Sequence, residues 1–102
     1  MTLPTEKRTL LTIITETIVE PTLLRDLDRW GVRGYTVSDA RGKGSRGVRD
    51  AAWEEAANIR IETICSRKVA EDVLGHLKNH YYVNYAMVAF LTEIEVLRPE
   101  KF

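Results

Sequence analysis

The pattern of apolar and polar residues along the chain predicts four strands. Threonine, isoleucine and leucine dominate residues 8–16, which is typical of a largely buried strand. Residues 58–65 alternate between apolar and polar side chains, which indicates a half-buried strand. A short strand is expected at 34–38, and a last strand at 86–97, whose first half is apolar on both faces.

Apolar residues at helical spacing predict two amphipathic helices between these strands. The first helix begins at Pro21, which has no N–H group to leave unpaired in a first turn, and ends at Gly31. The second helix follows Ser66, a good N-cap, and extends to about Tyr81. The order β-α-β-β-α-β predicts an α+β, ferredoxin-like fold, with one antiparallel sheet and two helices on one face.

The length of 102 residues predicts a single domain over residues 1–102. A domain of this size buries a core but has little room for a deep pocket, so a ligand site is expected to be shallow or shared between subunits. Because the last strand is apolar on both faces, further copies of the chain are expected to cover the open side of the sheet. We therefore predict a cyclic homo-oligomer.

Charge, cysteine content and hydropathy narrow the functional classes. Fifteen basic and fifteen acidic residues cancel, which argues against bulk nucleic-acid binding. No apolar run approaches ~18 residues, so no membrane insertion is expected, and residues 1–9 lack the apolar segment of a signal peptide. The single Cys65 cannot form an internal disulfide and is expected to be a small core residue. A cytoplasmic protein is the expectation.

The segment 39–57 carries the candidate chemistry. It shows neither a strand nor a helix period and is predicted to be a long loop, which in a compact domain is usually functional or disordered. Glycines let its backbone approach an anion, and the guanidinium groups of Arg46 and Arg49 can converge on one phosphate. A solvated loop without a specific ligand explains the composition about equally well. The residues concerned are Gly42, Lys43, Gly44, Ser45, Arg46 and Arg49.

The chain resembles the PII signalling superfamily and, within it, the carbon-type PII-like proteins associated with bicarbonate transporters and carboxysomes. The resemblance extends from residue 10 to residue 102. Such proteins are ferredoxin-like homotrimers that bind adenine nucleotides in the clefts between subunits and have a long loop between the second and third strands. The most specific segments are residues 34–37, 42–46, 48–49, 58–59, 84–85 and 95–97, which read GYTV, GKGSR, VR, NI, NY and EVL.

This resemblance implies a set of nucleotide-binding residues. Thr36 falls at the adenine end of the site, the glycines and Ser45 at the phosphate end, and Arg98 supplies a further phosphate contact. Backbone groups near Ile64, Cys65 and Ala89 are expected to meet the adenine. The full expected set is Thr36, Gly42, Lys43, Gly44, Ser45, Arg46, Arg49, Ile64, Cys65, Ala89 and Arg98.

The segment 80–85 departs from the nitrogen-type PII proteins, which have a glycine-rich loop with a lysine before the last strand. Here the segment reads HYYVNY. The contacts to a third phosphate are therefore weakened, which favours AMP or ADP over ATP, and cyclic AMP is left open. The departure also removes the basis for expecting 2-oxoglutarate sensing.

The interpretation is a regulatory signalling protein and not an enzyme, with no prosthetic group and no metal. The resemblance implies that it responds to bicarbonate and acts through its loop on a bicarbonate transporter or a carboxysome-linked partner, peripherally at the membrane where that partner is a transporter. One alternative is a small ferredoxin-like phosphohydrolase. Against this alternative, no residue near the loop stands out as a base that could activate water. The other is a single-stranded RNA binder, which would need exposed aromatic residues on the central strands.

The sequence leaves the roles of two sets of aromatic residues open. His76 and His80 lie four residues apart and can share a metal ion, but a solvated helix face is favoured because zinc sites usually have three or four ligands. Tyr81, Tyr82 and Tyr85 can stack on a base or fill a seam between subunits.

Overall fold

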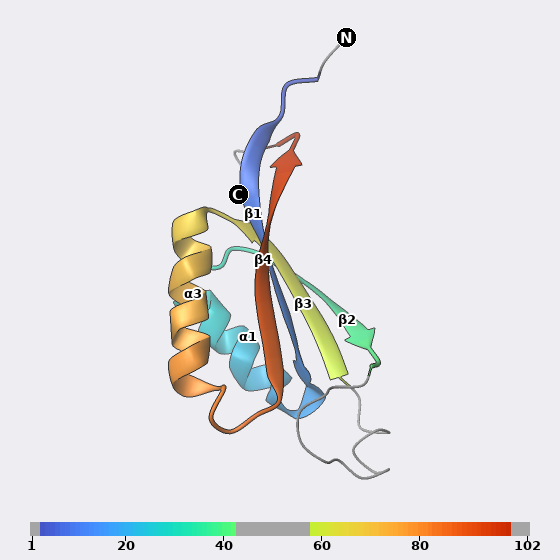
Figure 1. Ribbon diagram of the computed structural model, residues 1–102, viewed down its shortest axis with the longest axis vertical. Helices are drawn as coiled ribbons and strands as arrows, with labels where there is room; N and C mark the ends of the chain where they lie inside the picture. The colour runs from blue at the N-terminus through green and yellow to red at the C-terminus, as the bar shows by residue number, and fades with distance from the viewer. Residues whose placement is uncertain (1–2, 43–57, 99–102) are drawn as a thin grey trace.

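The computed structural model describes residues 3–42 and 58–98 (Figure 1). One antiparallel sheet has the strand order β2-β3-β1-β4, and both helices lie on the same side of it (Figure 1). This architecture confirms the predicted ferredoxin-like fold. The elements in chain order are β1 (Glu6–Glu16), the 3-10 turn η1 (Thr17–Val19), α1 (Glu20–Arg29), β2 (Thr36–Ala40), β3 (Asn58–Cys65), α3 (Arg67–His80) and β4 (Met87–Val96).

The core lies between the sheet and the two helices. Ile13 of β1 lies opposite Ile61 of β3 and Ala89 of β4, so these side chains share the face that the helices cover. Full burial of a leucine or isoleucine side chain contributes about 1.5–3 kcal/mol, and this layer supplies most of the hydrophobic stabilisation. Its fully buried members include Leu11, Ile13, Leu23, Leu27, Ile61, Ala70, Val73 and Leu77.

The helix boundaries follow local capping chemistry. A proline occupies the first turn of α1, and Gly31 adopts a left-handed φ of 94° just after the helix, as the sequence predicts. The hydroxyl oxygen of Ser66 accepts a hydrogen bond of 3.2 Å from the backbone N–H of Val69 and caps α3. No helix in the described ranges is long and apolar enough to cross a membrane.

Strand β2 lies two residues further along the chain than the sequence predicts. The carbonyl of Gly34 accepts a hydrogen bond of 2.5 Å from the Thr63 hydroxyl instead of joining the ladder. Asp39 and Ala40, predicted to begin the loop, pair with β3. The connection after β2 therefore begins at residue 41, and residues 43–57 lie outside the described part of the chain.

The sheet face away from the helices carries exposed apolar side chains, as predicted for the last strand. Val88 lies opposite Ile14 and is 56% exposed, and Phe90 lies opposite Thr12 and is 40% exposed. The Thr12 hydroxyl is buried on this face and has no hydrogen-bond partner among the described residues. Exposed apolar surface beside a buried, unpaired polar atom is typical of a surface that another molecule covers.

Candidate functional site

One group of the expected nucleotide-binding residues lies along the edge formed by β2. Thr36 begins β2 and pairs with Glu62, and Ile64 lies two residues further along β3 on the same face. The pairing of β2 ends at this position, whereas β3 continues to Cys65. Within the described ranges, the last residues of β3 therefore have no ladder partner on the β2 side, and their backbone can accept or donate hydrogen bonds there. Gly42 follows the far end of β2 and is exposed.

A second group lies at the opposite edge of the sheet, on β4. Ala89 pairs with Ile13, and Arg98 follows the end of β4 and is exposed. Strands β3 and β1 lie between the two edges. With neighbouring strands ~4.8 Å apart, β2 and β4 are separated by about 14 Å. The structure therefore does not bring the expected residues together within one chain.

The side chain of Cys65 faces the helices and not the candidate site. It lies opposite Thr9 and is 6% exposed, which confirms the predicted core position. Burial raises the pKa of its thiol, so the thiol stays protonated at neutral pH. Only the backbone of Cys65 is available to a ligand at the β2 edge.

Five of the expected phosphate-binding residues lie outside the described residues: Lys43, Gly44, Ser45, Arg46 and Arg49. Their role therefore stays a prediction from the sequence.

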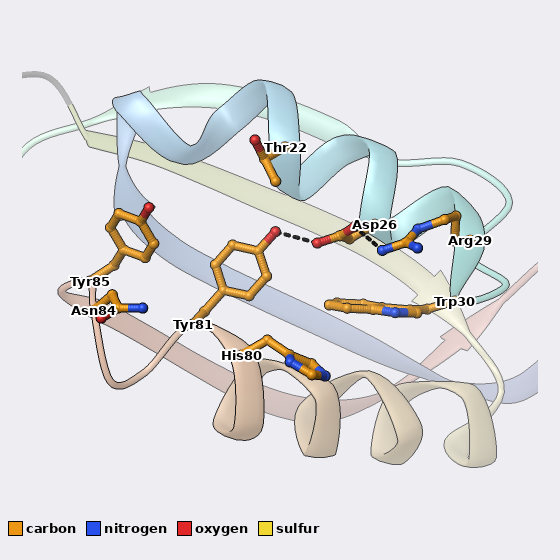
Figure 2. Close-up of a pocket in the computed structure, with 8 residues that line it drawn as sticks. All are labelled: Thr22, Asp26, Arg29, Trp30, His80, Tyr81, Asn84 and Tyr85. Carbon is orange, nitrogen blue, oxygen red and sulfur yellow. Dashed lines mark hydrogen bonds and ion pairs between the residues drawn. The ribbon is translucent and has the colours of Figure 1, made fainter.

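Tyr81, at the end of α3, and Asp26 of α1 form a hydrogen-bonded pair that the sequence did not suggest. The Tyr81 hydroxyl donates a hydrogen bond of 2.5 Å to Oδ2 of Asp26, and the guanidinium group of Arg29 pairs with Oδ1 of the same carboxylate (Figure 2). Tyr81 is 4% exposed. It is therefore part of the core, and the prediction that it stacks on a base or fills a subunit seam is wrong. The two partners are 55 positions apart in the sequence, so no local pattern indicates this pair.

Asp26 and Tyr81 each keep a single protonation state at neutral pH. Burial alone would raise the pKa of Asp26, but the hydrogen bonds from Tyr81 and Arg29 outweigh it and lower that pKa. Burial and the hydrogen bond to Asp26 raise the pKa of Tyr81. Asp26 is therefore ionised and Tyr81 protonated over the physiological range, and the hydrogen bond keeps its charge-assisted form.

The two histidines pack against an aromatic side chain. The rings of Trp30 and His76 are stacked, and His80 lies further along the same surface with its ring centroid 6.5 Å from that of Trp30. Within the part of the chain that the structure covers, no group of three or more His, Cys, Asp or Glu residues could hold a metal ion. The predicted solvated helix face is thus, in part, a packing surface for Trp30.

Comparison with known proteins identifies the class that this fold defines. The family described as nitrogen regulatory protein P-II matches residues 8–101. A structure described as a PII-like signaling protein from Thermus thermophilus is 40% identical, with a TM-score of 0.83 over 98% of this chain and 99% of that one. The CPII protein of Thiomonas intermedia K12, in a structure bound to ADP and bicarbonate, is 28% identical, with a TM-score of 0.83 over 99% of each chain.

A second structure of the Thiomonas CPII protein is bound to ADP, AMP and acetate. It is 29% identical to this chain, with a TM-score of 0.85 over 98% of both chains. This chain therefore belongs to the P-II family of signalling proteins. It is a PII-like protein of the carbon type.

Proposed function

We propose that this protein is an adenylate sensor that binds AMP or ADP between the subunits of a homotrimer. The observation that carries the proposal is the division of the expected binding residues between the two edges of the sheet. Thr36 and Ile64 lie at one edge, and Ala89 and Arg98 lie at the other. A cleft between the β2 edge of one subunit and the β4 edge of the next would reunite them.

The sheet face away from the helices supports the proposal of a trimer. Val88 and Phe90 present apolar surface there, and the buried Thr12 hydroxyl has no partner within the described residues. Packing of three such faces around an axis removes this surface from water, which is favourable in proportion to the apolar area buried.

The segment before β4 supports a preference for AMP and ADP. Residues 81–86 contain neither glycine nor lysine, so they offer no glycine nest and no cation for a third phosphate. In the proposed orientation the base lies toward Thr36 and the phosphates toward Gly42, where Arg46 and Arg49 join the site. Cyclic AMP, which has a single phosphate, is a further candidate ligand.

Bicarbonate is the proposed second signal. The Thiomonas relative has been observed with ADP and bicarbonate bound together. We expect the anion to bind beside the nucleotide or to act through a partner, and the loop between β2 and β3 to change its order with the occupied state. A bicarbonate transporter or a carboxysome-linked protein would detect that change, peripherally at the membrane in the first case.

Isothermal titration calorimetry tests the proposal. We expect AMP and ADP to bind more tightly than ATP, and bicarbonate to strengthen their binding by reciprocal coupling. Charge-assisted hydrogen bonds contribute ~1.5–3 kcal/mol, so the double variant Arg46→Ala/Arg49→Ala should bind ADP at least about tenfold more weakly. The matched control replaces two exposed helix arginines, Arg25 and Arg67, with alanine.

Three results would contradict parts of this proposal. Absence of nucleotide binding would remove its central claim, and unchanged ADP affinity in the Arg46/Arg49 variant would remove the phosphate role of the loop. Nucleotide hydrolysis by the purified protein would favour a phosphohydrolase instead.

A further inference from the structure

Hydrogen bonds to one residue, Tyr81, hold the turn between α3 and β4. The backbone carbonyl of Tyr81 accepts hydrogen bonds from the N–H groups of Asn84 and Tyr85, both at 3.0 Å. The side chain of Tyr81 spans the gap to α1 and donates to Asp26 (Figure 2). The start of the turn is therefore fixed to α1 through Tyr81.

The other end of the turn is fixed to β1. The N–H of Ala86 donates a hydrogen bond of 2.8 Å to a carboxylate oxygen of Glu16, and its carbonyl accepts one of 2.9 Å from the Thr15 hydroxyl. Strand β4 begins at the next residue. The turn thus connects two anchors, one on α1 and one on β1, and leads directly into an edge strand.

The side of the turn that faces α1 is not densely packed. A pocket of about 310 Å³ separates Thr22 and Asp26 of α1 from Asn84 and Tyr85 of the turn (Figure 2). Exposed Val83 lies between the anchors at 82% exposure. Tyr82 packs against the core and the ring of Tyr85 contacts that of Tyr81, but residues 83–85 are exposed. The position of this exposed part therefore depends chiefly on the hydrogen bonds at the two ends of the turn.

We propose that Asp26 and Tyr81 are positioning residues for the nucleotide cleft. Their hydrogen bond fixes the turn, and the turn sets the position at which the β4 edge, including Ala89, is presented to the neighbouring subunit. Arg29 holds the second carboxylate oxygen and so orients Asp26 toward Tyr81. This inference rests on the proposed function, since it assigns a role at that cleft to residues that lie outside it.

ADP titration of four proteins tests this inference: the unchanged chain, Tyr81→Phe, Asp26→Ala and the double variant. Each single substitution is expected to weaken ADP binding about three- to tenfold. The double variant should bind ADP no more weakly than the weaker-binding of the two single variants, because both substitutions remove the same hydrogen bond. Hydrogen exchange of residues 82–86 should accelerate in all three variants, whereas exchange in β3 should not change.

Tyr82→Phe is the matched control. It removes a neighbouring phenolic hydroxyl for which the described part of the chain contains no hydrogen bond, and it should bind ADP as the unchanged protein does. If Tyr81→Phe lowers the thermal midpoint but leaves ADP affinity unchanged, the pair is structural only and the inference is overturned. If the unchanged protein binds no ADP, the proposed function fails first, and this inference fails with it.

Discussion

The indole ring of Trp30 lies flat on the imidazole ring of His76, with centroids 4.6 Å apart and planes inclined by 16°. Trp30 also meets Tyr81 edge to face, with centroids 6.3 Å apart. These contacts join the C-terminal end of α1 to the last two turns of α3. They lie beside the Asp26–Tyr81 hydrogen bond, so the same region carries both the aromatic and the polar contacts between the helices.

The first prediction concerns this stacked pair. His76→Ala should lower the free energy of unfolding by ~0.5–1.5 kcal/mol, because the variant loses an aromatic contact that is partly shielded from water. Urea denaturation followed by circular dichroism measures the change. The control is Lys78→Ala on the exposed side of the same helix, and equal stability of the two variants would show that the stacking contributes nothing.

The second prediction concerns the centre of the core. Leu27 is fully buried on α1. Leu27→Ala should cost about 2–5 kcal/mol, since the transfer free energy of the lost methyl groups and the cavity they leave both destabilise the fold. Leu3→Ala is the matched control, because Leu3 is 59% exposed. A loss of similar size in both variants would contradict the assigned core.

Most of this fold could be predicted from the sequence, because the spacing of apolar residues along the chain indicates which side chains are buried. The alternation at 58–65 predicted both ends of β3, and the Pro21 and Gly31 signals bracketed α1. The error at the start of β2 arose because this end of the strand depends on a tertiary contact. The bond from the Thr63 hydroxyl to the Gly34 carbonyl joins positions 29 residues apart and has no local sequence signature.

Less of the candidate site could be predicted from the sequence. Resemblance selected Thr36, Ile64 and Ala89, but only the strand order shows that they lie at two different edges of the sheet. The Asp26–Tyr81 pair was not found at all, because a tyrosine at the end of an amphipathic helix fits many environments. Long-range hydrogen bonds of this kind follow from packing geometry, and hydrophobic patterns do not encode them.

The third prediction concerns the open face of the sheet. Phe90→Asp should convert the expected trimer to monomers, because assembly would then bury an unpaired carboxylate in apolar surroundings. Native mass spectrometry reports the change at micromolar concentration. Ile18→Asp is the control, since Ile18 is 77% exposed on η1 and not on this sheet face. A trimer that persists in the Phe90 variant would place the subunit interface elsewhere.

The fourth prediction concerns the pH dependence of the Asp26–Tyr81 pair. Hydrogen bonding lowers the pKa of Asp26 in the folded state below its ordinary 3.8, so the stabilisation it gives is present above that value and is lost as the pH falls through the folded pKa. The pKa of Tyr81 is raised above its ordinary 10.0, so its contribution is complete below pH 10 and is lost only at more alkaline pH. The stability difference between the unchanged protein and Asp26→Ala should therefore be constant from pH 6 to 9 and shrink below pH 4. Urea denaturation across this range measures it, with Asp72→Ala on exposed α3 surface as the control. A difference that grows on acidification would mean that the carboxyl is protonated in the folded protein and that Tyr81 is not its donor.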